Sequence, residues 1–217
     1  MIVTIDGPAG AGKSTIARAL AQRLGFRFLD TGAMYRAVAW AARQQQLDWS
    51  QPEALIDLAQ GLDLCITERA VTVNGIDVTQ DIRSNEITGV THYAANNPGV
   101  RHILVAQQRQ LADGDNIVTE GRDQGTVVFP HAECKIYLTA TPEERARRRA
   151  QELTERGQPT AVEEVLRKQN ERDRRDASRE VGPLVAADDA VEVETDGLSP
   201  MEVLDRLEAL VRERMRP

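Results

Sequence analysis

The sequence has few of the residues that would mark a disulfide-stapled, metal-clustered or membrane protein. It holds two cysteines, Cys65 and Cys134, among 217 residues, and aromatic residues make up 4% of the chain. Each cysteine stands alone in an apolar stretch, so we expect two free, buried thiols, as in a reducing compartment. No apolar run approaches the roughly 18 residues that span a bilayer, and the first residues lack the features of a signal peptide. These absences predict a cytoplasmic protein without a membrane partner.

Lysine is also scarce, because three of the 27 basic residues are Lys and the others are Arg. Ten of these arginines lie between Arg145 and Arg179. One interpretation is an exposed helix whose arginines pair with neighbouring glutamates, and we expect this for most of them. The other is that a subset binds phosphate, which the planar guanidinium group suits well. The net charge of −7 argues against a general nucleic-acid-binding protein.

The hydrophobic pattern predicts an α/β fold. A β-branched apolar run at 1–5 is followed by helical spacing at 14–24 and a second short strand at 26–30. A strand, helix and strand within 30 residues form a βαβ unit, which predicts a parallel sheet with helices on both faces. The pattern continues along the chain with strands at 116–120, 134–138 and 190–195 and helices at 98–112, 142–156, 161–176 and 199–214.

The stretch from 62 to 79 interrupts this alternation, because it predicts short strands joined by tight turns, with a hairpin turn at Asn74-Gly75. Predicted helices at 33–46, 52–60 and 83–95 flank it. We therefore divide the chain into one core and two insertions. The core comprises 1–30, 98–140 and 173–217, the larger insertion 31–97, and the shorter, Arg-rich insertion 141–172.

Residues Gly7 to Ser14 match the phosphate-loop pattern G-x-x-x-x-G-K-[ST] in full, between a predicted strand and a predicted helix. Glycines let backbone N–H groups curl around phosphate oxygens, and the helix N-terminus favours negative charge. Lys13 would reach the β- and γ-phosphates of ATP, and the Ser14 hydroxyl would bind Mg²⁺. The expected ATP-binding residues are Gly7, Pro8, Ala9, Gly10, Ala11, Gly12, Lys13, Ser14 and Thr15.

Charged residues also follow two other predicted strands. The segments Asp30–Arg36 and Glu120–Thr126 begin where strands end, and the carboxyl ends of parallel strands face the ligand crevice. Helical spacing places Arg172, Asp176 and Arg179 on one face of a polar helix. The sequence has no Asn-Lys-x-Asp guanine motif and little room for an output domain, which favours a small-molecule kinase. A regulatory module that binds ATP without turnover stays open as an alternative.

These motifs resemble those of bacterial cytidylate kinases over nearly the whole chain. The matching segments are IDGPAGAGKST, LDTGAMYRA, DVTQDIRSNE, EGRDQGTVVFP, ERARRR and the run from Arg172 to Ala190. The resemblance implies a P-loop NTPase-type five-stranded sheet. It also implies that 31–97 is a monophosphate-binding insertion with a small antiparallel sheet, and that 141–172 is a short helical lid. The implied reaction moves the γ-phosphoryl group of ATP to CMP or dCMP, with Mg²⁺. Adenylate, uridylate and sugar-acid kinases remain alternatives within the kinases.

The resemblance also implies roles for single residues. Arg36 and Arg122 would hold the acceptor phosphate, Arg101 and Asp123 the cytosine, and Thr31 would lie near the base. Arg172, Asp176 and Arg179 would bind the ribose and its phosphate side. Among the lid arginines, Arg148 or Arg149 would contact the transferring phosphoryl group beside Lys13.

The chain departs from the family pattern at His92, which stands in place of a serine that helps to read the base, and at Gln124, which replaces an apolar residue. Gln124 lies within the matching segment EGRDQGTVVFP, and Thr91 stands beside His92. We expect the protein to work as a monomer on small-molecule substrates, without a nucleic-acid partner.

Overall fold

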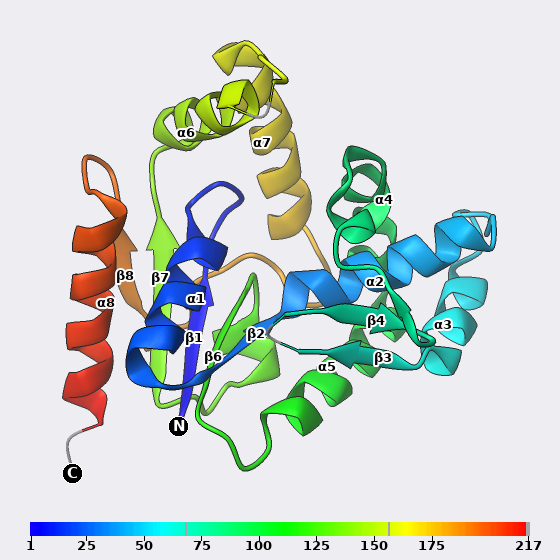
Figure 1. Ribbon diagram of the computed structural model, residues 1–217, viewed down its shortest axis with the longest axis horizontal. Helices are drawn as coiled ribbons and strands as arrows, with labels where there is room; N and C mark the ends of the chain where they lie inside the picture. The colour runs from blue at the N-terminus through cyan, green and yellow to red at the C-terminus, as the bar shows by residue number, and fades with distance from the viewer. Residues whose placement is uncertain (68, 156, 216–217) are drawn as a thin grey trace. The chain divides into compact units, whose positions relative to one another are not determined.

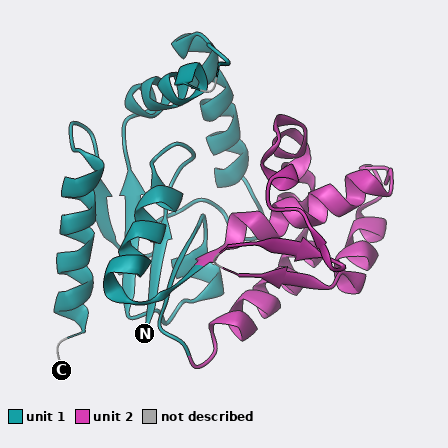
Figure 2. Ribbon diagram, in the orientation of Figure 1, with its two compact units in different colours: residues 1–28, 115–217 teal, residues 29–114 magenta. Residues whose placement is uncertain are grey.

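The computed structural model describes residues 1–67, 69–155 and 157–215. These residues form two compact units (Figure 2). Unit 1 comprises 1–28 and 115–217, and unit 2 comprises 29–114. Within the described ranges, no helix has the length and apolar character needed to cross a membrane.

The five-stranded sheet has the order β2-β6-β1-β7-β8 (Figure 1). Its strands are β1 (Ile2–Asp6), β2 (Arg27–Asp30), β6 (Ile117–Gly121), β7 (Cys134–Thr139) and β8 (Val191–Glu194). β1 pairs in parallel with β6 and with β7, and β7 pairs in parallel with β8. The chain leaves β1 toward one edge of the sheet and later fills the other edge, so β1 lies at a topological switch point, where ligands bind in such sheets.

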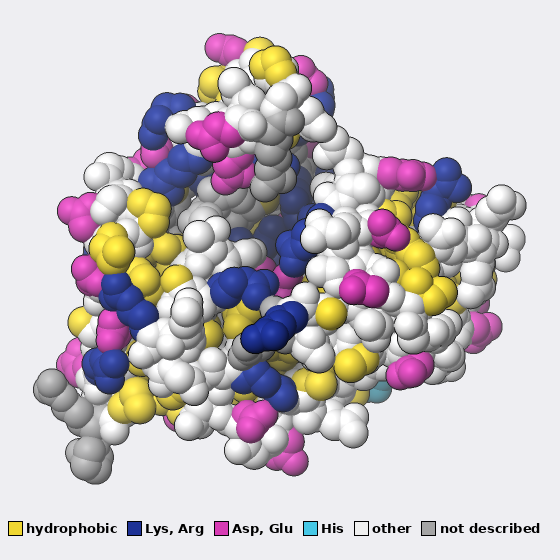
Figure 3. Space-filling view, in the orientation of Figure 1, with side chains coloured by type: hydrophobic (Ala, Val, Ile, Leu, Met, Phe, Trp, Pro, Cys, Tyr) yellow, Lys and Arg dark blue, Asp and Glu magenta, His cyan; other side chains and the backbone are white. Residues whose placement is uncertain are grey.

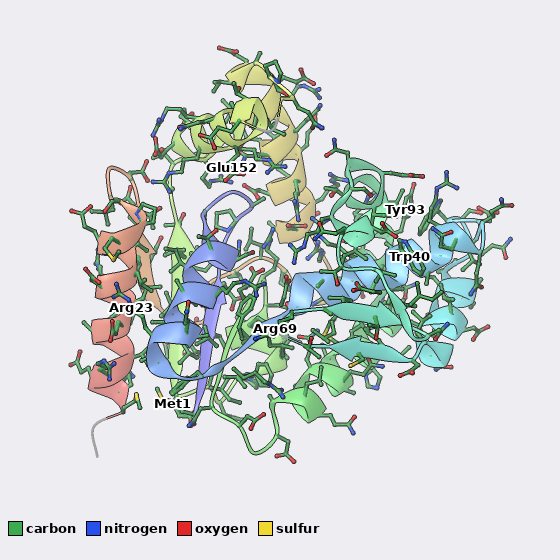
Figure 4. The ribbon with its side chains drawn as sticks, in the orientation of Figure 1. Met1, Arg23, Trp40, Arg69, Tyr93 and Glu152 are labelled. Atoms are coloured by element: carbon green, nitrogen blue, oxygen red, sulfur yellow. The ribbon has the colours of Figure 1, made fainter. Side chains whose placement is uncertain are left out.

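Helices α1 (Lys13–Leu24) and α8 (Pro200–Arg214) pack together on this sheet. Their apolar faces share one core with β1 and β7, built around Leu20, Ile136 and Leu207. A capping box between Ser199 and Glu202 begins α8. Arg23 on α1 extends toward α8, where it pairs with Asp205 and Glu208 (Figure 4). This side of unit 1 is therefore firmly packed behind the sheet.

Two polar helices, α6 (Pro142–Glu155) and α7 (Val162–Ala177), pack against each other in unit 1. Their shared apolar cluster is small and contains Ala146, Ala150 and Val165, with Leu153 and Leu166 beside it. The helix expected at 142–156 agrees with α6 through residue 155, and residue 156 lies outside the described residues. The Arg-rich insertion belongs to unit 1 and is no separate unit.

Unit 2 contains the helices and the small sheet of the larger insertion. Its elements are α2 (Thr31–Gln44), α3 (Pro52–Gly61), β3 (Leu64–Ile66), β4 (Val71–Val73), β5 (Ile76–Asp77), η1 (Asp81–Arg83), α4 (Asn85–Asn96) and α5 (Pro98–Ala112). The three strands form an antiparallel sheet. Asn74 and Gly75 both have positive φ between β4 and β5, which confirms the hairpin turn predicted there. Met34, Val38, Val73 and Leu104 belong to the core of this unit.

The structure corrects two expectations. Residues 98–112 form α5 and belong to unit 2, not to the sheet-containing core, because Val100 and Leu104 join the unit 2 cluster. Gly99 lies so close to α3 that an added Cβ would stand 2.3 Å from Ile56 Cδ1. Cys65 is exposed, whereas Cys134 is buried and free as expected. Cys65 lies on β3, where alternation turns it away from the side that holds Leu64 and Ile66.

Candidate active site

The carboxyl ends of the central strands bring the sequence motifs of unit 1 to one edge of the sheet. In the strand register, Asp6 of β1 lies opposite Gly121 of β6 and Tyr137 of β7. The phosphate loop begins directly after β1, and the Gly121-Arg122-Asp123 loop begins with the last residue of β6. Two of the predicted motifs therefore meet at the end of β1.

The phosphate loop has the backbone that its glycines predict. Gly7, Gly10 and Gly12 all have positive φ, at 145°, 81° and 82°. A Cβ at Gly7 would lie 2.0 Å from the backbone oxygen of Leu138, so the loop passes too close to β7 for any side chain. Gly12 ends the loop as the left-handed N-cap of α1. The first N–H groups of α1 have no partner within the helix, which leaves them oriented for an anion.

Lys13 lies at the start of α1 with 5% of its surface exposed. Its ammonium group donates a 2.7 Å hydrogen bond to the Pro8 backbone oxygen, across the loop. Burial and the nearby Arg122 charge together lower the pKa of Lys13 to about 7, although Glu120 opposes the shift. A bound triphosphate would supply the negative charge that raises this pKa again and keeps Lys13 protonated.

Ser14 and Glu120 form an oxygen pair at the same helix N-terminus. The Ser14 hydroxyl donates a 2.8 Å hydrogen bond to Glu120 Oε1. Hydroxyl and carboxylate oxygens are hard ligands that suit Mg²⁺, which takes one or two protein groups and completes its shell with phosphate and water. In the part of the chain that the structure describes, no cluster of three or more His, Cys, Asp or Glu side chains could hold a metal alone. The residues present therefore fit a Mg²⁺ ion that arrives with a nucleotide.

Asp6 connects the end of β1 to the loop after β6. Its carboxylate accepts hydrogen bonds from the backbone N–H groups of Gln124, at 2.9 Å, and Gly125, at 2.7 Å. These two residues begin the π-helical turn η2 (Gln124–Val128). Burial raises the pKa of Asp6 to about 6, against these two hydrogen bonds. The Asp6 carboxylate thus fixes the backbone next to Arg122 and Asp123.

Asp176 of α7 gathers three of the predicted arginines. Arg122 Nε donates to Asp176 Oδ2 at 2.9 Å, Arg179 pairs with Oδ1, and Arg172 lies 3.9 Å from Oδ2. Although burial opposes a buried charge, these arginines hold the pKa of Asp176 below its ordinary value. Burial likewise works against the Arg122 charge, but Asp176 and Glu120 raise the pKa of Arg122 above its ordinary value. Arg172 and Asp176 lie one helical turn apart on α7 as predicted, whereas Arg179 lies just after the helix and reaches the same carboxylate. The structure adds Arg122 to the group.

The two predicted lid arginines differ in their partners. Arg148 donates to Glu144, to the Thr195 hydroxyl and to the Thr195 backbone oxygen, at 2.8, 3.0 and 2.6 Å. Arg149 pairs with Glu152 across one turn of α6. Basic and acidic side chains alternate over α6 in the upper left of Figure 3, as expected for a helix with surface ion pairs. Arg148 is therefore tied to the end of β8, while Arg149 holds an exposed pair that can open at little cost.

Unit 2 carries the other predicted substrate residues. Thr31 is buried at the start of α2, and Arg36 on the same helix donates to the Ile82 oxygen at 3.1 Å and to the Thr88 hydroxyl at 2.7 Å. Arg101 on α5 is buried, donates to the Ala95 oxygen at 3.1 Å, and lies over the Tyr35 ring.

His92 on α4 is half-buried and lies 2.8 Å, through Nδ1, from the Gly89 oxygen. Its ring tilts against Tyr93, which stacks on Trp49 with 5.0 Å between ring centroids. His92 thus belongs to an aromatic cluster of unit 2, a surrounding that the sequence does not reveal.

Sequence reasoning missed four polar residues of unit 1: Asp6, Glu120, Arg145 and Asp173. Asp6 is the last residue of β1 and Glu120 the next-to-last residue of β6, so their position near the strand ends was a usable signal. Arg145 and Asp173 contact the phosphate loop from α6 and α7. A contact between residues 164 positions apart leaves no local pattern.

A family model described as cytidylate kinase matches residues 3–213. A curated cytidylate kinase of Rhodopirellula baltica is 53% identical over 213 residues, which cover 98% of this chain and 93% of the relative. One from Geobacillus sp. is 46% identical and covers 98% of this chain and 97% of the relative. A bifunctional pantoate ligase/cytidylate kinase of Synechococcus sp. is 50% identical, and the chain spans 45% of its length.

Solved structures with low identity share the fold. A shikimate kinase from Bacteroides thetaiotaomicron aligns with a TM-score of 0.50 at 13% identity, over 98% of each chain. An uncharacterized protein from Eubacterium ventriosum aligns with a TM-score of 0.53 at 11% identity, also over 98% of each chain. At these identities the likeness concerns the fold alone. It agrees with the five-stranded α/β architecture expected from the sequence.

Proposed function

Because the chain belongs to the cytidylate kinase family, we propose that it transfers the γ-phosphoryl group of ATP to CMP or dCMP, giving ADP and CDP or dCDP. The observation that carries this proposal is the complete phosphate loop at the end of β1, next to the Gly121-Arg122-Asp123 loop. ATP would place its phosphates along the loop and the start of α1. The acceptor phosphate is already an anionic nucleophile, so its attack needs no general base, and catalysis consists of alignment and charge neutralisation.

The residues of unit 1 divide this work by charge. Lys13 would neutralise the β- and γ-phosphates, and Arg122, fixed by Asp176, would hold the acceptor phosphate. Ser14 and Glu120 would hold the Mg²⁺ that accompanies ATP and offsets the charge of the bound phosphates. Arg149, whose exposed pair with Glu152 opens easily, is the better placed lid arginine, because Arg148 is bound to Thr195.

The remaining assignments follow the family resemblance. Unit 2 would bind the monophosphate through Thr31, Arg36, His92 and Arg101, and Asp123 of unit 1 would read the exocyclic amine of cytosine. α6 and α7 would act as the lid. We further propose that the protein works in the cytoplasm and as a monomer. The buried, free thiol of Cys134 is consistent with a reducing compartment.

An ADP-release assay with four acceptors tests the reaction. CMP and dCMP should be good acceptors, UMP poor and AMP near background. ATP binding without acceptor-dependent ADP release would point to a regulatory module instead, and a preference for AMP or UMP would assign a different kinase. Lys13→Ala should lose at least about a hundredfold in kcat with the fold kept. Lys168→Ala is the matched control, since Lys168 forms an exposed pair with Glu164 on α7.

A second assay tests the base reader. Asp123→Asn should lower kcat/KM for CMP and narrow the gap between CMP and UMP, because an amide can donate to the uracil O4 where a carboxylate cannot. Asp115→Asn, at an exposed pair with Arg27, should leave the ratio unchanged. An unchanged CMP/UMP ratio in Asp123→Asn would remove Asp123 from the base site.

A further inference from the structure

One backbone residue of the phosphate loop is held on both of its polar atoms by side chains from elsewhere in unit 1. The Ala9 N–H donates to Asp173 Oδ1 of α7 at 3.1 Å. The Ala9 oxygen accepts a 2.7 Å hydrogen bond from Nη1 of the Arg145 guanidinium group on α6. Arg145 also pairs with Asp173 Oδ2 at 2.6 Å, so the three groups close a ring of hydrogen bonds. Ala9 is thereby fixed from two helices at once.

Arg145 is unusual among the arginines of α6 because it is buried, with 4% of its surface exposed. Its Nε donates to the Ala140 oxygen at 3.1 Å, at the end of β7. A buried guanidinium group needs partners for its donors, and here two backbone oxygens and one carboxylate supply them. Arg147 and Arg149 on the same helix form surface ion pairs, and water can satisfy their remaining donors. Burial and partners thus separate Arg145 from the rest of the Arg-rich segment.

Gly10 gives an independent indication that α7 and the loop are packed tightly. A Cβ at this position would lie 2.5 Å from Gln169 Nε2 of α7 and 3.4 Å from the Arg145 Cβ. Gln169 Nε2 itself lies 3.4 Å from the Arg145 backbone oxygen. A side chain here would have to displace the end of Gln169, and the positive φ of 81° independently favours glycine.

We propose that Asp173 and Arg145 are positioning residues that hold Pro8–Gly10 in the conformation that binds the phosphates of ATP. The Asp173 carboxylate and the Arg145 guanidinium neutralise each other, so the pair fixes the loop without adding net charge beside the phosphates. The Ala9 N–H donates to Asp173, so this group does not bind phosphate. The N–H groups at the start of α1 remain available for the phosphates. The inference rests on the proposed function, because it concerns the ATP site of that reaction.

Steady-state kinetics with each substrate varied in turn separate a positioning role from a merely structural one. Asp173→Asn keeps an oxygen for the Ala9 N–H but loses the pair with Arg145, and Arg145→Lys keeps the charge but loses the planar fork. Both variants should raise KM for ATP about tenfold or more, since a charge-assisted hydrogen bond is lost. KM for CMP should change less than about twofold. Glu171→Gln, which breaks an exposed pair with Arg167 on the same helix, is the matched control and should change neither constant.

Thermal unfolding with and without each nucleotide supplies the second measurement. The rise in Tm on adding ATP should shrink in both variants, and the rise on adding CMP should persist. An unchanged KM for ATP in a folded variant, an equal rise of both KM values, or a fall in KM for ATP would overturn the proposal. The last result would mean that Asp173 competes with phosphate for the loop. Failure of the proposed function is distinct, because wild-type protein would then show no acceptor-dependent ADP release.

Discussion

Three arginines converge on the carboxylate of Asp176, and this residue joins two motifs that lie far apart in the sequence. Arg122 follows β6, whereas Arg172 and Arg179 lie on and just after α7. A carboxylate among three guanidinium groups stays ionised, as the lowered pKa of Asp176 indicates. Asp176 fixes the Arg122 guanidinium group and, being ionised, can accept the further hydrogen bond that the proposed ribose contact requires.

We predict that Asp176→Ala lowers kcat/KM for CMP more than for dCMP. Loss of Arg122 positioning should affect both acceptors, but only CMP loses a hydrogen bond from its 2′-hydroxyl to a charged group. Such a bond contributes roughly 1.5–3 kcal/mol, so the CMP/dCMP ratio should fall by about tenfold or more. The ratio is its own control for damage to the fold. Equal losses with the two acceptors would give Asp176 a structural role alone.

Asp6 predicts a pH dependence of stability. Its pKa is raised from 3.8 to about 6 in the folded protein, so between pH 4 and 6 the folded state holds a proton that the unfolded chain releases. The contribution of Asp6 to the free energy of unfolding therefore falls as pH rises through that window, by at most about 1.4 kcal/mol per pH unit. Above the window this contribution is constant. Asp6→Asn cannot titrate and should lose this component. Urea unfolding of both proteins from pH 4 to 7 checks it, and parallel curves would contradict the assignment.

At the scale of elements, strands and helices were predictable where hydrophobic periodicity agrees with the turn and capping residues that bound each segment. The phosphate loop, the Asn74-Gly75 hairpin and the polar helices follow from local residue types. The π-helical turn at Gln124–Val128 was missed, because its first two N–H groups donate hydrogen bonds to Asp6. That residue lies 118 and 119 positions away in the sequence. The place of α5 was also missed, since an apolar helix face does not say which core it will join.

The α6 and α7 pair has a short apolar cluster, and its buried polar contacts lie at the end next to the phosphate loop, where Arg145 pairs with Asp173. Ala146, Ala150 and Val165 provide its buried apolar contacts, and exposed ion pairs cover its surface. Segments with few apolar contacts open most readily, and lids are drawn from them. We predict weak amide protection across 141–172 without ligand and strong protection with a bisubstrate analogue. Hydrogen exchange measures this, with β1 and β6 as protected references, and equal protection in both states would argue against a lid.

At the scale of the whole molecule, each unit has its own core. The sign of the net charge differs from that of the residues proposed to bind the substrates. The net charge is −7, yet the residues assigned to the anionic substrates are mainly Lys and Arg. Arginine supplies most of them because its planar guanidinium group binds phosphate in a fixed geometry, and because a carboxylate such as Asp176 can fix it in place. The sequence shows which residues have side chains that can bind phosphate. Their burial and their hydrogen-bond partners determine which of these side chains are fixed in one position.

The exposed apolar side chains bear on the oligomeric state. The larger ones in the described part of the chain are Ile76 on β5, Tyr93 on α4, Val162 on α7, Val181 and Val185 after α7, and Met201 and Met215 at the two ends of α8. A stable dimer buries about 1,200 Å² or more around an apolar centre. Side chains spread over separate elements are a poor basis for such a centre. We therefore predict a monomer of 24.0 kDa in sedimentation equilibrium, with or without nucleotides. An apparent mass that rises toward twice this value with concentration would show that copies of the chain associate, and substituting these side chains in turn would then locate the contact.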